Sequence, residues 1–153
     1  MPTPAIHFLK QRRLAFEIVS YEHLEKGAEF AAQATGFPLS RTVKTLVVAV
    51  DPKRHLLVLI PGDRQLDLKR LARALAAKKA AMADPLTAER LTGYRVGGIS
   101  PFGVRQALPV VMDQTLLGLE EVLINAGRRG VMRKMAPSVI RAGLDCMVAA
   151  VAD

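Results

Sequence analysis

Apolar and polar positions recur along this chain in short segments that predict strands and short helices in alternation. The clearest prediction is a β-hairpin, because the apolar runs 42–50 and 55–60 flank the tight-turn sequence Asp51-Pro52-Lys53-Arg54. Near the N-terminus, apolar and polar positions alternate over 16–20, which is typical of a strand. Further strands are predicted over 108–113, 121–125 and 144–151.

Helices are predicted where a capping residue precedes apolar positions three and four residues apart. Thr3-Pro4 is a typical helix start, and this first helix is expected to end near Arg13. Asp67 is expected to cap a helix in which Leu68 and Leu71 share one face. Other short helices are predicted over 28–35, from Asp84-Pro85 to Gly93, and after Ala136-Pro137. Hairpins with inserted helices favour an α+β fold on one curved mixed β-sheet.

The length of 153 residues fits a single domain that spans 1–153. Half of the residues are hydrophobic, but they fall into runs far shorter than a membrane span. The N-terminal segment shows no export signal. We therefore expect a cytoplasmic protein with no membrane association.

The charge balance indicates an anionic partner. Twenty-two Lys and Arg residues oppose fourteen Asp and Glu residues, which gives a net charge of +8. Nucleic acid is one partner class that this charge attracts, and solubility alone is an equally good explanation. Five basic residues on and after the predicted third helix could follow a nucleic-acid backbone or simply be solvated: Lys69, Arg70, Arg73, Lys78 and Lys79.

Several classes of catalytic site are absent from the sequence. His7, His23 and His55 lack the spacing of a metal site, so neither a metal nor another cofactor is expected. There is no serine-hydrolase elbow or phosphate-binding loop. The single cysteine, Cys146, lies among apolar residues and is expected to be a packed thiol.

Lys44 occupies an unusual position in the predicted hairpin. Strand alternation places it on the same face as Leu46 and Val48. A lysine there must reach solvent, contact an anion or have a lowered pKa. The pattern alone does not choose between a solvent-exposed and a functional lysine.

Two glycine-containing loops could also contribute to a site. The segment Val96-Gly97-Gly98-Ile99-Ser100-Pro101 allows close approach of a ligand to the backbone, although ordinary turns use the same residues. Gly127-Arg128-Arg129-Gly130 places two guanidinium groups in a flexible turn, where they could bind phosphate or remain solvated.

Considered together, seven segments resemble the YbaK family of aminoacyl-tRNA deacylases, in family order and over nearly the whole chain. The lysine strand combined with the Gly-Gly-Ile-Ser-Pro loop is the most specific part. The segments are Tyr21-Glu22-His23, Val43-Lys44-Thr45-Leu46, Gln65-Leu66-Asp67-Leu68-Lys69, Met82-Ala83-Asp84-Pro85, Thr92-Gly93-Tyr94, Gly97-Gly98-Ile99-Ser100-Pro101 and Gly127-Arg128-Arg129-Gly130.

The resemblance implies a fold, a reaction and a site. The expected fold is the partly barrel-like editing domain, also found inserted in bacterial prolyl-tRNA synthetases, and the reaction is hydrolysis of the ester of a mischarged tRNA. Lys44 matches the essential lysine that positions the terminal nucleotide and ester. The loop Gly97–Pro101, including Gly98, Ile99 and Ser100, matches the loop around the aminoacyl group, and Tyr21 and Thr45 match pocket positions. Ser100 is not a family nucleophile, so water or a substrate group would attack.

The expected partners are aminoacyl-tRNA, in particular tRNA(Pro), and prolyl-tRNA synthetase. The resemblance departs at Met132, where Cys-tRNA deacylases of this family commonly carry an aspartate. This departure weakens the assignment of cysteine but not of deacylation, so the amino acid removed is expected to be cysteine or another small one. A non-catalytic module that binds tRNA or docks on the synthetase is the main alternative. An unrelated nucleic-acid-binding protein is disfavoured, because the seven Phe and Tyr residues are not clustered on one strand.

Overall fold

The computed structural model describes residues 3–22, 27–51 and 53–153. His23 of the first resemblance segment and Pro52 of the predicted hairpin turn lie outside the described residues. In the described ranges, no helix is long and apolar enough to cross a membrane.

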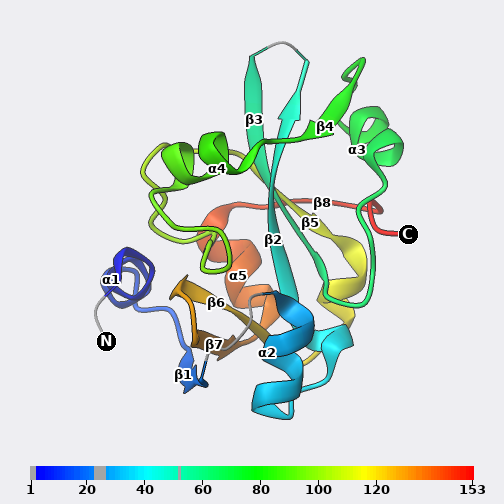
Figure 1. The fold of residues 1–153 in the computed structure, drawn as a ribbon. Coiled ribbons are helices and arrows are strands. Elements are labelled where there is room, and N and C mark those ends of the chain that lie inside the picture. Colours follow the sequence, from blue (N-terminus) through cyan, green and yellow to red (C-terminus); the bar gives the residue numbers. More distant parts are fainter. Residues whose placement is uncertain (1–2, 23–26, 52) are drawn as a thin grey trace.

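A five-stranded sheet forms the centre of the molecule (Figure 1). Its strand order is β4-β2-β3-β5-β8, with antiparallel pairing around β2 and parallel pairing of β3 with β5 and of β5 with β8. The predicted hairpin is confirmed: Val43 lies opposite Pro61, and Val50 lies opposite Arg54. The strands are β2 (Val43–Val50), β3 (Arg54–Pro61), β4 (Ala80–Met82), β5 (Val110–Asp113) and β8 (Met147–Ala149).

A second, three-stranded antiparallel sheet lies beside the start of β2 (Figure 1). It has the order β1-β7-β6 and consists of β1 (Glu17–Ser20), β6 (Val122–Arg128) and β7 (Val131–Met135). A bridge between Thr42 and Leu123 connects the two sheets. The α+β class is thus confirmed, but the described strands form two sheets that are not closed into a barrel, where the sequence predicted one curved sheet.

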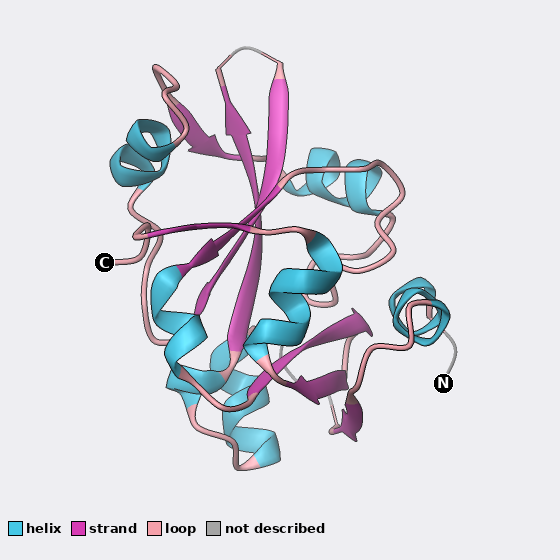
Figure 2. Cartoon of the chain, turned by 180° about the vertical axis from the view of Figure 1, so that it is seen from behind, coloured by secondary structure: helices cyan, strands magenta, loops and turns pink. Residues whose placement is uncertain are grey.

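Short helices cover both faces of the larger sheet, as the view from behind shows (Figure 2). The side chains of Thr3, Asp67 and Asp84 each accept a hydrogen bond from a first-turn backbone N–H, as expected for N-caps. The helices are α1 (Pro4–Gln11), α2 (Ala28–Thr35), α3 (Leu68–Ala74), α4 (Pro85–Thr92) and α5 (Pro137–Leu144), and 3-10 turns occur at Leu39–Arg41 and Gln114–Gly118.

From Leu56 to Pro61, strand β3 is apolar because both of its faces are buried. Leu57 and Leu59 point into the core shared with α1, α4, α5 and the smaller sheet. Val58 and Ile60 point to the opposite face, where they pack with Leu71 of α3. The larger sheet is therefore the rigid layer on which the residues of β2 are held.

Candidate functional site

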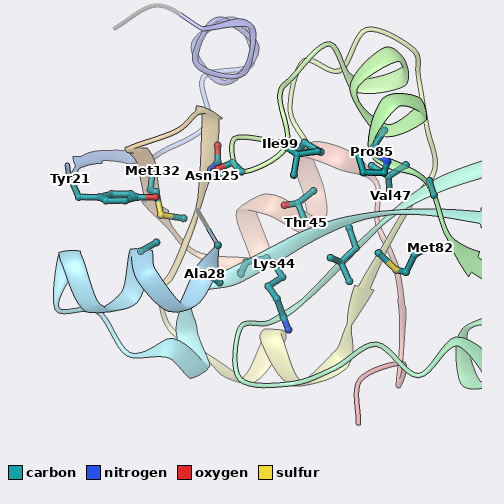
Figure 3. A pocket seen from close by; sticks show the side chains of 18 residues that line it. Tyr21, Ala28, Lys44, Thr45, Val47, Met82, Pro85, Ile99, Asn125 and Met132 are labelled. Atoms are coloured by element: carbon teal, nitrogen blue, oxygen red, sulfur yellow. Dashed lines mark hydrogen bonds between the residues drawn. The ribbon is translucent and has the colours of Figure 1, made fainter. Parts of the chain in front are cut away.

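A pocket of about 320 Å³ lies where the start of β2 meets α2, α4 and the smaller sheet (Figure 3). Most of its lining is apolar, and Lys44 is the one charged residue among the described lining residues. The lining consists of Tyr21, Gly27, Ala28, Ala31, Val43, Lys44, Thr45, Leu46, Val47, Met82, Ala83, Pro85, Ala88, Val96, Gly97, Ile99, Asn125 and Met132.

The pocket follows one edge of β2. Strand β4 pairs with β2 only at Val48–Val50, and Thr42 at the other end bridges to Leu123 of β6. Residues 43–47 lie between these two pairings, and all five line the pocket. The site therefore forms where β2 changes its neighbour from one sheet to the other.

Lys44 is held by the loop that follows β3. The alternation predicted from the sequence is present, because Leu46, Val48 and Val50 pack together under α3. The Lys44 ammonium group donates a hydrogen bond to the main-chain carbonyl of Arg64. Burial lowers the pKa of Lys44, and the negative charge of Asp63 opposes this effect. Lys44 is thus a half-buried cation at the pocket wall.

Thr45 supplies an uncommitted polar group to the same pocket. Its hydroxyl oxygen is buried and has no hydrogen-bond partner within the described part of the chain. A buried hydroxyl without a partner is unfavourable unless a ligand or water satisfies it. Next to Lys44, this hydroxyl offers a hydrogen bond to a bound molecule.

The glycine loop is fixed by three side chains from other elements. Val96 N–H donates to the Glu89 carboxylate at 2.9 Å, and the Asn125 amide donates to the Gly97 carbonyl at 3.1 Å. The Arg129 guanidinium donates to the Val96 carbonyl at 2.6 and 2.9 Å. The loop backbone is therefore already ordered around the pocket.

Two glycines make this loop possible. Gly97 has a φ of 94°, which residues with a side chain rarely adopt. A Cβ at Gly98 would lie 3.0 Å from the backbone nitrogen of Arg129. The Gly-Gly pair thus allows the loop to pack directly on the Gly127–Gly130 turn.

Behind the loop lies a buried arginine that the sequence analysis did not identify. Arg133 is completely buried and donates to Ser100 Oγ at 3.0 Å and to the Asn125 carbonyl at 2.7 Å. Its guanidinium carbon lies 4.9 Å from the centre of the Phe102 ring. Burial lowers the pKa of Arg133 to about 10, so the side chain stays charged at neutral pH.

Tyr21 and Met132 form the wall on the side of the smaller sheet (Figure 3). Met132 is 3% exposed and packs in one apolar cluster with Ala31, Leu123 and Tyr21. Burial raises the pKa of the Tyr21 hydroxyl, which therefore remains protonated at neutral pH.

The structure brings most of the predicted pocket residues together. Tyr21, Lys44, Thr45, Gly97 and Ile99 all line the pocket. Gly98, Ser100 and Pro101 belong to the loop but are not among the lining residues, and all three are buried. The sequence analysis did not assign Val47, Met82, Pro85 or Asn125 to the pocket. Met82 and Pro85 lie in a resemblance segment, but apolar side chains carry no chemical signature, and the place of Asn125 depends on the fold.

The predicted tRNA-binding residues fall into two groups. Arg70 lies 3.4 Å from Asp67 and donates to the Ala152 carbonyl, and Arg129 is bound to Val96, so both have partners within the protein. Lys69 and Arg73 instead line an exposed groove. Arg128 is exposed at the end of β6. Contact of any of these residues with RNA stays a prediction.

Cys146 lies outside the pocket. Its thiol is half-buried beside the Ile140 carbonyl, and burial raises its pKa to about 11. A thiol with a raised pKa is a poor nucleophile at neutral pH, which agrees with the predicted packing role.

The pocket is small and mostly apolar, and a few polar groups converge on it, which is typical of a small-molecule binding site or active site. The aminoacyl-tRNA editing domain model matches residues 24–142. The chain therefore belongs to the aminoacyl-tRNA editing family, whose members are deacylases that hydrolyse the aminoacyl-tRNA ester.

Individual relatives agree with this family. The chain is 31% identical to a candidate Cys-tRNA(Pro)/Cys-tRNA(Cys) deacylase, EbsC, of Enterococcus faecalis, over 90% of this chain and 85% of the relative. It is 32% identical to the multifunctional Ser/Thr-tRNA deacylase ProXp-y of Escherichia coli K12, over 80% and 75% of the two chains. A solved structure of a candidate trans-editing enzyme for prolyl tRNA synthetase superposes with a TM-score of 0.88 at 28% identity, covering 100% of this chain and 99% of the other.

Proposed function

We propose that this protein removes a small, wrongly attached amino acid from tRNA(Pro), with Lys44 as the essential residue of the site. The observation that carries the proposal is the pocket itself. In it, the Lys44 cation and the Thr45 hydroxyl, which has no partner among the described residues, lie on one strand beside an ordered glycine loop. Membership in the aminoacyl-tRNA editing family indicates which bond is broken: the ester between the amino acid and the terminal ribose.

In the proposed reaction, water or a nucleophilic group of the substrate attacks the ester carbonyl carbon. When water attacks, the bond to the ribose oxygen breaks, and the products are the free amino acid and a tRNA with a free terminal hydroxyl. When the thiol of a cysteine substrate attacks instead, the same bond breaks, the ribose oxygen takes up a proton, and the amino acid leaves as a cyclic thioester. An aminoacyl ester is already activated, so positioning and electrostatic stabilisation suffice without a covalent intermediate. Lys44 would hold the terminal nucleotide and ester, and its charge would stabilise the developing oxyanion.

Other proposed contacts follow from the pocket wall. The backbone of Gly97 and Ile99 would surround the aminoacyl group, and Tyr21 would close the pocket over it. Gly98, Ser100 and Pro101 would support this loop from behind rather than touch the substrate. A pocket of about 320 Å³ with this apolar lining fits a small side chain.

Met132 and Thr45 support a proposed range of amino acids. Met132 offers no charge to an α-ammonium group, and the Thr45 hydroxyl can bond a hydroxyl or thiol. We therefore propose serine, cysteine and alanine as the candidate side chains. The relatives that act on Cys-tRNA and on Ser/Thr-tRNA support this range.

Prolyl-tRNA synthetase is the proposed partner, because it would supply the mischarged tRNA(Pro). The similarity to a candidate trans-editing enzyme for prolyl tRNA synthetase supports this partner. We place the reaction in the cytoplasm, where tRNA is charged. The alternative, a non-catalytic module that binds tRNA or docks on the synthetase, predicts binding without hydrolysis.

The test is a panel of tRNA(Pro) charged with Cys, Ala, Ser or Pro, each incubated with the purified protein. Release of at least one non-cognate amino acid faster than its spontaneous hydrolysis, with Pro-tRNA(Pro) spared, is the expected result. Binding of all four without accelerated release would instead support the non-catalytic module.

A further inference from the structure

A second concave surface of the protein lies between α3 and β4, outside the pocket. It is lined by Leu68, Lys69, Ala72, Arg73, Ala77, Lys78, Lys79 and Ala80, and is called the basic groove below. Four of these eight residues are cations and none is acidic. All four cationic residues are exposed.

The cations of the basic groove are held close together by the fold. Lys69 and Arg73 are four residues apart on α3, so they share one face of the helix. After α3 the chain turns at Ala76, whose φ is 54°, and returns along the helix, with Ala77 N–H bonded to the Ala72 carbonyl at 2.8 Å. Like charges at this spacing repel each other, and an anion between them relieves that repulsion.

Asp51 fixes the returning segment without neutralising the groove. Its carboxylate accepts hydrogen bonds from the backbone N–H groups of Lys78 and Lys79, at 3.0 and 3.4 Å. The same carboxylate lies 3.6 Å from the Arg54 guanidinium. Asp51 thus orders the backbone between α3 and β4, while the ammonium groups of both lysines remain exposed.

The basic groove and the pocket contact opposite ends of the short strand β4. Ala80 lines the groove and Met82 lines the pocket. A strand rises about 3.3 Å per residue, so these positions are roughly 7 Å apart along β4. Lys44 lies six residues before Val50, which pairs with Ala80, so the lysine and the groove are roughly 20 Å apart along β2. A single-stranded RNA end of a few nucleotides can span that distance and contact both surfaces.

We infer that the basic groove binds the phosphates of the single-stranded RNA end whose terminal nucleotide enters the pocket. The inference rests on the proposed function, because that function places an RNA 3′ end at Lys44. The occupant is an RNA backbone rather than a folded protein. Among the described lining residues, four are cations and none is aromatic, and Leu68 is the one large aliphatic side chain beside three alanines.

Binding of uncharged tRNA(Pro) to the full-length protein tests the inference independently of hydrolysis. The variants are the pairs Lys69→Gln/Arg73→Gln and Lys78→Gln/Lys79→Gln. The matched control is Lys10→Gln/Arg141→Gln, which removes two exposed cations on α1 and α5. Each groove pair should weaken binding by about tenfold at low salt and lower the slope of log affinity against log salt by about 1.4, for two lost phosphate contacts.

An RNA hairpin with a four-nucleotide 3′ tail and the same hairpin with a blunt end show which part of the RNA is bound. The wild type should prefer the tailed hairpin, and the groove pairs should lose that preference. Groove variants that bind tRNA like the control pair, or that lose affinity equally for the blunt hairpin, would overturn the inference.

Hydrolysis of an aminoacyl ester of adenosine, which carries no phosphate, separates this inference from the proposed function. The groove pairs should hydrolyse it at the wild-type rate while losing activity on charged tRNA. A wild-type protein that hydrolyses neither ester would contradict the proposed function, and the binding comparison would still decide whether the groove holds RNA.

Discussion

The Arg133 guanidinium donates a hydrogen bond to Ser100 Oγ at 3.0 Å, although 33 residues separate the two along the chain. The same guanidinium nitrogen donates to the Asn125 carbonyl, so one buried cation connects the glycine loop with β6. Two other nitrogens of Arg133 are buried without partners among the described residues. Such a buried cation costs folding free energy, so its position in support of the pocket loop indicates a positioning function.

Replacing Arg133 should therefore affect catalysis more than substrate binding. In Arg133→Met, Ser100 and the Asn125 carbonyl lose a donor, and the loop that is proposed to surround the aminoacyl group can shift. We expect kcat to fall by about tenfold with a smaller change in KM, because a small misplacement weakens transition-state contacts first.

The conservative variant Arg133→Lys should recover part of this loss, because it restores a buried cation and one hydrogen bond. Thermal unfolding of both variants establishes that the rates are compared for folded protein. Wild-type kcat in Arg133→Met would show that this arginine has no role in positioning the loop.

The pH dependence of catalysis should follow the charge of Lys44. Burial lowers the pKa of this lysine from its usual 10.5, and the cation is the proposed active form. The enzyme-catalysed rate, corrected for spontaneous hydrolysis, should therefore decline as pH rises and reach half its plateau below pH 10.5. Lys44→Arg, if it retains measurable activity, should not show this decline, because arginine stays charged.

Stability should show the opposite dependence on pH. Because the folded-state pKa of Lys44 is below its unfolded-state value, the folded protein releases this proton first as pH rises. The free energy of unfolding should gain a positive contribution between the lowered pKa and 10.5, and Lys44→Met should lack that contribution. Denaturant titrations of both proteins across this range measure it, and identical pH slopes would contradict the assigned burial effect.

Met132 should influence which amino acid is removed. It is 3% exposed on the pocket wall, so Met132→Asp places a carboxylate next to the substrate site, where it can bond an ammonium group or thiol. We expect this variant to change the ratio of Cys to Ala release from tRNA(Pro), whereas Met132→Leu should keep it. If the ratio of Cys to Ala release is the same in the wild type and both variants, Met132 does not determine specificity.

Much of the local structure could be predicted from the sequence. The hairpin was recognisable because both of its strands are long and apolar, and the helices starting at Asp67 and Asp84 carry capping side chains. Helix α2 begins and ends where predicted, with Gly36 as a left-handed C-cap. These features depend on neighbours in the sequence and need no tertiary information.

Two strands and the division into two sheets could not be predicted in the same way. Strand β4 has three residues, which are too few to show the alternation of apolar and polar positions that identifies a strand. In β7 the alternation is masked because Arg133, a polar residue type, is fully buried. The pocket is assembled from β2, the glycine loop and Asn125, which are distant in the sequence. The family resemblance implied that β2 and the loop meet, but the periodicity of the sequence could not predict this contact.

The central claim is that the Lys44 pocket hydrolyses the ester of a mischarged tRNA. The most direct measurement is the single-turnover deacylation rate of Lys44→Ala and wild type on the tRNA(Pro) substrate that the wild type deacylates fastest. Loss of the cation should cost about 3 kcal/mol of transition-state stabilisation, a decrease of roughly a hundredfold or more, with an unchanged circular dichroism spectrum. A Lys44→Ala protein that deacylates this substrate at close to the wild-type rate would contradict the claim.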